Sequence, residues 1–308
     1  MKKIVITGGT GLVGRSVCEH LFERDAGCRL VVPTRRRATG RDLQVLPTVD
    51  LAVADVHDAK AITPVLHGAD ALVHLVAILH GSADDFDRVH VQLPRTLAAA
   101  CTASGVKRVV HVSALGVAPN APSAYLRSKA AGEAVWQDWA RATGGQLTIL
   151  RPSVIFGAED RFTNLFVQLQ RLFPVLPLAG TGARFQPVWV GDVARAVVNS
   201  LYAAAATGPV FECAGPEVMT LKQIVQRVGT LAGCRRPVLA LPEAAGMLQA
   251  AVMGWLPGEP MMSRDNVLSM RVPNVASGTL PGLAALGITP VSLDTLAGHF
   301  RPADPRQR

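Results

Sequence analysis

The chain has 308 residues, a formal net charge of +8 and a sequence pI near 9.7. Hydrophobic residues make up 49% of it and charged residues 18%, which suffices for a large core and excludes a disordered chain. The positive charge favours acidic partners, such as a phosphorylated cofactor or anionic lipid. Basic and aromatic residues are not interleaved along the chain, so we expect no nucleic-acid partner.

The five cysteines are scattered without C-x-x-C spacing, and the histidines show no H-x-x-x-H pattern. We therefore predict reduced thiols, no disulfide framework and no metal site. The first strand begins so early that no room remains for a signal peptide, and no apolar run has spanning length. These features predict a cytoplasmic protein.

The first twenty residues organise the rest of the chain. Ile4–Ile6 is a β-branched run typical of a buried strand, and apolar residues at helical spacing follow from Val13. Between them, Gly8 suits a tight turn, Gly11 lets the backbone approach a pyrophosphate, and Gly14 lets the helix pack closely. The pattern predicts dinucleotide binding at a helix N-terminus, although a glycine-rich turn without a ligand is the alternative. The predicted cofactor contacts in this turn are Gly8, Thr10, Gly11, Leu12, Val13 and Gly14.

The second predicted strand, Arg29–Pro33, is followed by three arginines and no carboxylate. A carboxylate there would bind the ribose 2′-hydroxyl of NAD, whereas arginine accommodates the 2′-phosphate of NADP. We therefore predict NADP (NADPH) in preference to NAD, with Arg35 and Arg36 as the contacts. The alternative is a solvated basic loop.

Two further strands contribute predicted cofactor contacts. After the third strand, Val49–Val53, Asp55 and Val56 are placed to meet the adenine, although Asp55 can equally cap the next helix. The fourth strand is predicted over Asp70–Leu79, and its Leu75, Val76 and Ala77 end is expected along the cofactor. We interpret His74, inside this strand, as a core residue.

The middle of the chain continues the alternation of strands and helices. We predict a loop over Gly81–Asp87, then a helix over Phe86–Ala103 that Pro94 kinks or breaks. A strand over Lys107–Val112 ends at Ser113, and a helix begins near Tyr125. A sixth strand covers Leu147–Leu150.

Tyr125 and Lys129 lie four residues apart on a predicted helix and therefore share one face. An ammonium beside a phenol lowers the pKa of the phenol, and the same lysine can hold a nicotinamide ribose. Ser113 can bind a substrate oxygen nearby. We predict Tyr125 as acid and base, Lys129 as its partner and Ser113 as substrate polariser. A surface tyrosine and lysine without chemistry is the alternative.

The alternation predicts an α/β fold with a doubly wound parallel sheet and a smaller, mostly helical C-terminal lobe. The predicted Rossmann-like domain covers residues 1–157, with 186–213 returning to it, and 158–185 and 214–308 form the lobe. Within these ranges we predict a helix from about Asp192, a strand over Val210–Cys213 and a helix over Thr220–Ala232.

The segment Leu239–Pro260 is mostly apolar, with Glu243 and Glu259 as its only charged residues. One interpretation is a core helix of the C-terminal lobe. The other is an apolar face that dips into a membrane interface, with Trp255 at headgroup depth and arginines on either side.

Taken together, these motifs resemble the extended and atypical short-chain dehydrogenase/reductases. The resemblance rests on TGGTGLVG at Thr7–Gly14, Asp55, the Tyr125–Lys129 pair, RPSVIFG at Arg151–Gly157, and Asp192 in WVGDVA. The segments YLRSKAAGE, QPVWVGDVA and EPMMSRDNV are similar to the family of the NADPH-carrying accessory subunit of mitochondrial complex I and its bacterial relatives. The resemblance further implies cofactor contacts from Val112, Lys129, Pro152, Ser153 and Ile155.

This chain departs from the enzyme pattern at two places. Ala114 stands where extended enzymes carry a second serine or threonine, and the asparagine that many relatives use in the preceding helix is missing, with His90 and Gln92 nearby.

We expect an oxidoreductase of unknown substrate, carbonyl or quinone-like. The alternatives are a non-catalytic nucleotide-binding subunit or assembly factor of a membrane respiratory complex, and a sugar-nucleotide epimerase or dehydratase. Its expected partners are the dinucleotide, an unknown small molecule and a membrane surface or membrane complex at the inner face.

Overall fold

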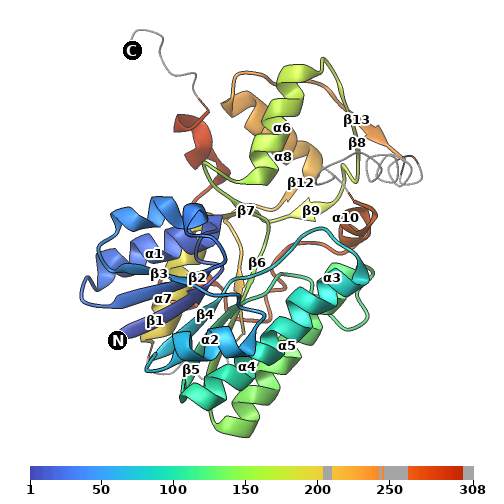
Figure 1. The fold of residues 1–308 in the computed structure, drawn as a ribbon. Helices are drawn as coiled ribbons and strands as arrows, with labels where there is room; N and C mark the ends of the chain where they lie inside the picture. The colour runs from blue at the N-terminus through green and yellow to red at the C-terminus, as the bar shows by residue number, and fades with distance from the viewer. Residues whose placement is uncertain (204–209, 243–244, 246–262, 301–308) are drawn as a thin grey trace.

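The computed structural model describes residues 1–203, 210–242, 245 and 263–300. A seven-stranded sheet with the order β11-β6-β5-β4-β1-β2-β3 forms its centre, and all its strand pairs are parallel (Figure 1). The strands are β1 (Lys3–Thr7), β2 (Arg29–Thr34), β3 (Val49–Val53), β4 (Ala71–His74), β5 (Arg108–Val112), β6 (Gln146–Pro152) and β11 (Val210–Cys213). The predicted doubly wound sheet is confirmed, but β4 ends at His74 and not at Leu79.

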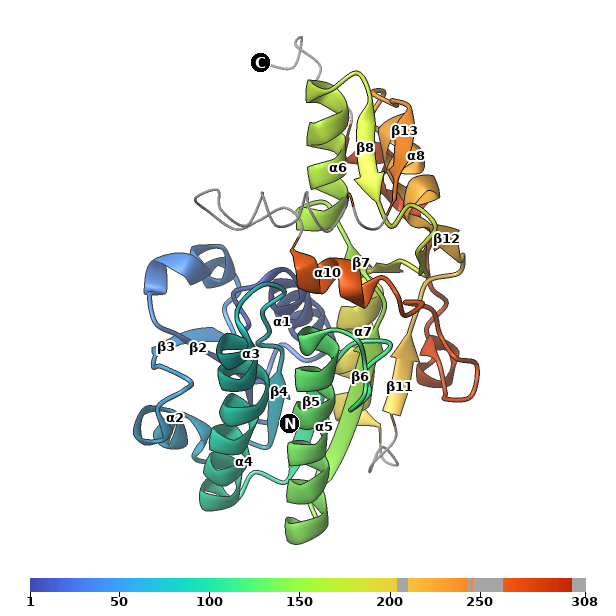
Figure 2. The same ribbon diagram turned by 90° about the vertical axis from the view of Figure 1, so that its right-hand side faces the viewer.

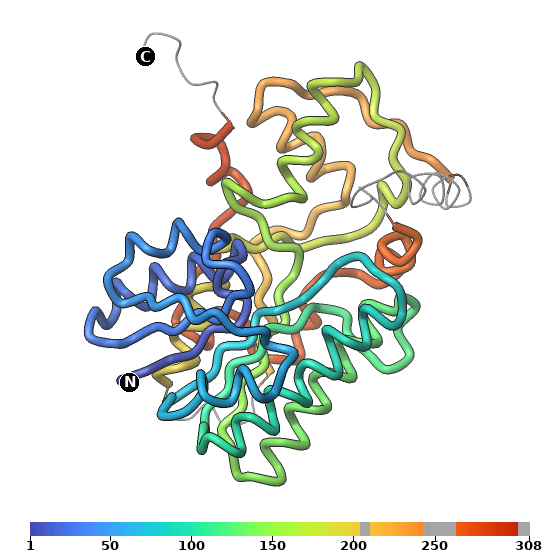
Figure 3. Tube along the Cα trace, viewed as in Figure 1, coloured from blue at the N-terminus to red at the C-terminus, as the bar shows by residue number. Residues whose placement is uncertain are grey.

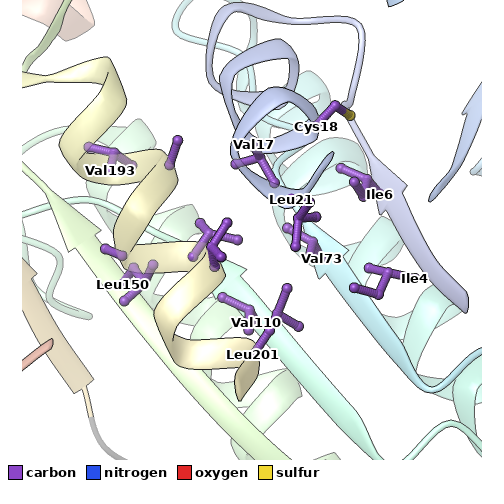
Figure 4. Packing of buried hydrophobic residues seen from close by; sticks show 14 of the residues in the cluster. Ile4, Ile6, Val17, Cys18, Leu21, Val73, Val110, Leu150, Val193 and Leu201 are labelled. Atoms are coloured by element: carbon purple, nitrogen blue, oxygen red, sulfur yellow. The ribbon is translucent and has the colours of Figure 1, made fainter. Parts of the chain in front are cut away.

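Helices cover both faces of this sheet. One face carries α1 (Leu12–Arg24) and α7 (Val190–Tyr202), and the other carries α2 (Ala59–Leu66), α4 (Leu93–Ser104) and α5 (Ala124–Thr143). Because side chains alternate along a strand, β1 contributes Ile4 and Ile6 to the first face and Val5 to the second. Figure 4 shows the first of these cores, where side chains of α1 and α7 pack over β1, β4, β5 and β6.

The strand order reverses at one point. The chain builds β1, β2 and β3 toward one edge and then returns to place β4 on the other side of β1. At such a reversal, the loops after the two central strands diverge and leave a crevice at the carboxyl end of the sheet, where ligands of open α/β sheets bind. The glycine turn after β1 and the 75–77 segment after β4 therefore lie at the same place.

The segment between β4 and β5 differs from expectation. Ser82 and Asp85 form a capping box that starts a short helix, α3 (Ala83–Asp87), in the predicted loop. A π-helical turn, η2 (Arg88–Gln92), then joins α3 to α4. Pro94 lies in the first turn of α4, where the missing N–H of a proline removes no hydrogen bond within the helix. The predicted break therefore falls before Pro94, in the π turn, and not at the proline itself.

A second, smaller region stands over the carboxyl end of the sheet (Figure 2). Its core joins α6 and α8 to the parallel pair of β8 and β13, so the predicted mostly helical lobe is confirmed. Its elements and the short strands that link it to the sheet are α6 (Arg161–Leu172), α8 (Leu221–Leu231), β7 (Ile155–Phe156), β8 (Leu176–Ala179), β9 (Arg184–Phe185), β10 (Val188–Trp189), β12 (Met219–Thr220) and β13 (Val238–Leu241).

Residues 263–300 contact both regions. This segment contains α10 (Arg264–Ser269), η3 (Leu283–Leu286) and η4 (Leu293–Gly298), whereas η1 (Arg37–Val45) follows β2. Leu283 and Ile288 pack in the core of the sheet, and Leu296 packs in the core of the smaller region. The trace in Figure 3 shows this orange-to-red segment passing beside both. The domain boundaries given above remain a prediction.

The apolar segment Leu239–Pro260 is described only in part. Leu239–Leu241 belongs to β13, and residues 243–244 and 246–262 lie outside the described residues, as does the tail from 301. Among the helices that the structure describes, none is long and apolar enough to cross a bilayer.

Three histidines are buried beneath the carboxyl end of the sheet. His74 and His111 face each other across β4 and β5, with their rings stacked at 5.2 Å and packed against Trp136. Thr7 Oγ1 lies 2.9 Å from His74 Nδ1, which confirms His74 as a core residue. Burial lowers the pKa of His74 and of His111 well below the usual value, and lowers the pKa of His90 to about 3.

These lowered pKa values predict a loss of stability in mild acid. The unfolded chain takes up protons below about pH 6.5, whereas the folded chain does not, so the stability present above pH 6.5 is lost as pH falls. Each buried histidine contributes about 1.4 kcal/mol per pH unit to this loss. Urea unfolding between pH 7 and 5 measures it. We expect the free energy of unfolding to fall less steeply with pH in His111→Asn than in the exposed control His67→Asn. Equal slopes in the two variants would contradict the role of the buried histidine.

Candidate functional site

The glycine turn has the geometry that a dinucleotide requires. Gly8 has φ +80°, and a Cβ there would lie 3.1 Å from the backbone of Leu75 and Val76. A Cβ on Gly14 would lie 2.4 Å from the carbonyl oxygen of Gly8, so only glycine lets α1 pack this closely against the turn. Gly11 is the N-cap residue of α1 and no described side chain caps the helix. The first amides of α1, from Leu12 and Val13, are therefore directed at the crevice with the positive end of the helix dipole.

The other predicted adenosine contacts lie on the β2 and β3 side of this turn. Arg35 and Arg36 follow the end of β2, which pairs with β1, and both side chains are exposed. Asp55 is exposed after β3, where its Oδ1 accepts a hydrogen bond from the His57 amide at 3.0 Å. The alternative role for Asp55 as helix cap is wrong, because Asp58 caps α2 through the Lys60 amide.

The segment after β4 forms the opposite wall. The Leu75 amide donates to the Thr7 carbonyl at 3.0 Å, which continues the pairing of β1 and β4 for one residue. Leu75 and Val76 are half-buried against Gly8, and Ala77 is exposed. Thr10, on the other side of the turn, is half-buried and faces Gly40 of η1. The structure thus brings these predicted contacts together around one turn.

Lys129 connects the catalytic candidates to the sheet. It lies on α5 with its side chain 2% exposed, and its Nζ donates to the carbonyl oxygen of Val112 at 2.8 Å. Burial lowers the pKa of Lys129 to about 8, and the nearby carboxylate of Glu133 opposes this shift. Glu133 in turn accepts two hydrogen bonds from Arg151, at 2.9 and 2.5 Å, which join α5 to β6. The lysine is therefore fixed beside the end of β5.

Ser113 is the residue after Val112 and is 5% exposed. Its Oγ has no hydrogen-bond partner among the described residues, although its backbone amide donates to the Leu150 carbonyl. A buried hydroxyl without a partner costs free energy unless a ligand satisfies it, so Ser113 has the character expected of a substrate-binding group.

Tyr125 lies in the first turn of α5, and its ring packs edge-on against His90 and Phe86, at centroid distances of 5.6 and 6.1 Å. Burial raises the pKa of Tyr125 to about 12. The expectation that Lys129 lowers this pKa is wrong for this arrangement, because the ammonium is bonded to Val112 and desolvation of the phenol dominates. The phenol is thus held in its protonated form.

His90 links the cofactor side of the crevice to Tyr125. The Ile78 amide donates to His90 Nε2 at 3.1 Å, so the ring proton lies on Nδ1, which donates to Ser128 Oγ at 2.8 Å. Ser128 Oγ donates in turn to the Tyr125 carbonyl at 2.8 Å. The lowered pKa of His90 keeps the ring neutral and this chain of bonds intact. The histidine holds its place in the π turn, because Gly132 leaves room for the His90 carbonyl.

Asp265 of α10 holds the same turn of α5 from the other side. Its carboxylate accepts from the Ala124 amide at 2.7 Å and from the Tyr125 amide at 3.0 Å. A carboxylate at a helix N-terminus satisfies otherwise unpaired amides and the helix dipole. Both peptide groups of Tyr125 are therefore bonded to side chains. Sequence spacing gave no signal for Asp265, since it lies 140 residues from Tyr125.

The remaining predicted contacts follow β6. Pro152 ends this strand and is buried, and Ile155 begins β7, which pairs with β10. Ser153 lies between them, but its Oγ donates to Asn274 Oδ1 at 2.7 Å. In this structure, Ser153 therefore anchors the segment around Asn274 to the edge of the site.

These features define a Rossmann-type nucleotide-binding fold with a tyrosine, a lysine and a serine near its crevice. Comparison with known families agrees, since residues 4–214 match the NAD dependent epimerase/dehydratase family. The chain belongs to this family, and the resemblance stated above is confirmed.

Curated relatives and solved structures extend this result. The chain is 31% identical over 300 residues to the mitochondrial NADH dehydrogenase [ubiquinone] 1 alpha subcomplex subunit 9 of Mus musculus, covering 94% of this chain and 77% of that protein. It is 31% identical over 199 residues to a ceramide reductase of Caulobacter vibrioides, covering 63% of this chain and 59% of that protein. An NADPH-dependent quinone oxidoreductase from Escherichia coli, solved with NADPH, shares the fold, with a TM-score of 0.78, 23% identity and coverage of 96% and 99%.

The bonds of His90 predict a graded loss of stability on substitution. His90→Asn can retain the donor to Ser128, His90→Gln can retain the acceptor for Ile78, and His90→Phe retains neither. Because a buried polar group without its partner costs about 1–3 kcal/mol, Phe should lower the free energy of unfolding most, with Asn and Gln in between. Urea unfolding at pH 7.5 measures the series. A Phe variant as stable as wild type would show that the chain of bonds contributes nothing.

Proposed function

We propose that this protein binds NADP(H) in the crevice between β1 and β4 and acts as an oxidoreductase on a carbonyl or quinone-like substrate. One observation carries the proposal: Lys129 is buried and fixed beside the unpartnered hydroxyl of Ser113, on the same helix face as Tyr125. The 31% identity to a ceramide reductase over 199 residues supports it.

The cofactor, when bound, supplies the hydride that adds to the substrate carbon. Tyr125, whose pKa of about 12 keeps it protonated at neutral pH, donates its proton to the substrate oxygen, so a carbonyl becomes an alcohol. Ser113 donates a hydrogen bond to the same oxygen and polarises it. Lys129 holds the nicotinamide ribose, and the tyrosinate that forms regains a proton from solvent. The reverse reaction uses the same groups in the opposite order.

A second candidate function is a nucleotide-binding subunit or assembly factor of a membrane respiratory complex, without turnover. The 31% identity to a mitochondrial NADH dehydrogenase subunit over most of the chain supports it. The raised pKa of Tyr125 also favours it, because a phenol whose pKa lies far from the working pH is a weak catalyst.

In either case we propose a cytoplasmic protein, peripheral at the inner face of the membrane. A sugar-nucleotide epimerase or dehydratase is a third proposal, which the 26% identity to a dTDP-glucose 4,6-dehydratase over 259 residues supports.

The nucleotide preference tests the cofactor assignment. Because a charge-assisted bond contributes about 1.5–3 kcal/mol, Arg35→Ala/Arg36→Ala should weaken NADPH binding at least tenfold and leave NADH binding nearly unchanged. Fluorescence titration of both nucleotides measures this, with Arg41→Ala, an exposed arginine on the following η1, as control. Equal affinity of the wild type for NADPH and NADH would contradict the proposed NADP preference.

Two further substitutions test the reaction. Tyr125→Phe should retain NADPH affinity and abolish nucleotide oxidation by a panel of quinones and carbonyls, since only the acidic proton is lost. Lys129→Met should weaken both, because the ammonium also holds the ribose. The other tyrosine of the chain, Tyr202, is the matched control, and Tyr202→Phe should keep activity. Full turnover by Tyr125→Phe would contradict the catalytic role, and NADPH binding without oxidation by any acceptor would favour the second candidate.

A further inference from the structure

The pair of β8 and β13 has an unusual outer face. Leu176 and Leu178 of β8 and Val238 of β13 are buried and pack on α6 and α8. Because side chains alternate, Pro177 of β8 and Leu239 of β13, which are paired in register, point outward. A two-stranded sheet with one solvated face normally presents polar residues there. Pro177 and Leu239 are instead both apolar and exposed, and Leu239 is 58% exposed.

The last residue of α6 and the turn that leads into β8 enlarge this apolar surface. Leu172, Phe173 and Val175 are 74%, 52% and 43% exposed, and they immediately precede β8. Half of the large exposed hydrophobic side chains among the described residues therefore belong to one edge of the smaller region. We name this edge the β8–β13 edge and define it as Leu172, Phe173, Val175, Pro177 and Leu239.

Basic residues predominate in the segments that build this edge. Residues 161–191 and 218–242, which build α6, β8, α8 and β13, contain no aspartate or glutamate. They carry seven cationic residues: Arg161, Arg171, Arg184, Lys222, Arg227, Arg235 and Arg236. Arg227 is paired with Asp294, but Arg171 and Arg235 are exposed and precede β8 and β13 at the same end of this parallel pair. A partner that is both apolar and anionic would complement this surface.

We propose that the β8–β13 edge docks on an anionic lipid bilayer, with its apolar side chains in the interface and its arginines at the headgroups. An interface offers apolar depth and negative charge together, and each cation near such a surface adds to the attraction. A second copy of the chain fits worse, since a symmetric dimer through this edge places two cationic surfaces against each other. The inference rests on the proposed membrane association and depends on neither the cofactor nor the reaction.

Vesicle flotation tests the edge directly. The full chain should float with phosphatidylglycerol-rich vesicles at low salt and much less with pure phosphatidylcholine or at high salt. Arg171→Glu/Arg235→Glu should reduce the partition coefficient more than about tenfold, since each cation contributes roughly fivefold. The control with the same charge change is Arg95→Glu/Lys107→Glu, at two exposed residues outside the smaller region, which should reduce it far less.

A second pair of variants tests the apolar part. Phe173→Ser/Leu239→Ser should weaken binding severalfold, whereas Val45→Ser, a 79% exposed valine on η1, should not. These positions are exposed, so the variants should fold, and NADPH binding measured in the same samples verifies this. Absence of flotation with anionic vesicles, or equal losses in variants and controls, would overturn the proposal. If the protein fails to bind anionic vesicles but still binds NADPH, the membrane proposal is wrong and the proposed cofactor is unaffected.

Discussion

The bond between the Lys129 ammonium and the Val112 carbonyl is the interaction on which the site depends. An ammonium that is 2% exposed has lost its hydration, and such a loss is tolerated only where polar partners replace water. The Val112 carbonyl and the nearby Glu133 carboxylate supply that replacement, and Glu133 is held by Arg151. This arrangement fixes α5 against the ends of β5 and β6. The position of Lys129 beside Ser113 therefore follows from the packing of the fold.

The same helix is held from two sides at Tyr125. His90 reaches it from the π turn through Ser128, and Asp265 reaches it from α10 through two amides. His90 also binds the Ile78 amide, so the wall beside the glycine turn and the start of α5 are joined by one ring. Such preorganisation matters for proton transfer, because a donor must stay within hydrogen-bond reach of its acceptor. It serves a bound nucleotide equally well in a protein without turnover.

Local patterns predicted most of the fold. The β-branched runs marked the strands, glycine spacing marked the turn after β1, and alternation of strand and helix predicted the parallel sheet. Failures occurred where a local signal was weak or misleading. The apolar run after Ala71 continued past the last paired residue, His74, and the polar residues after Gly81 concealed a capping box. The two outward positions of β8 and β13 were invisible until the pairing between them was known.

The site was predictable only where its residues are close in sequence. Tyr125 and Lys129 are one helical turn apart, so their shared face follows from spacing. The direction of the Tyr125 pKa did not follow, since it depends on burial by Phe86 and His90 and on where the lysine bonds. Asp265 and Asn274 escaped prediction because each meets its partner across more than 100 residues of chain. Long-range polar contacts of this kind leave no periodic signal.

A crystal structure of the complex with NADPH is the most direct test of the central claim, that the cofactor binds at the β1 and β4 crevice with its nicotinamide beside Tyr125. The account predicts the pyrophosphate on the amides after Gly11, the 2′-phosphate on Arg35 and Arg36, and the nicotinamide ribose on Lys129. A nucleotide bound elsewhere, or one whose nicotinamide lies away from Tyr125 and Ser113, would contradict it.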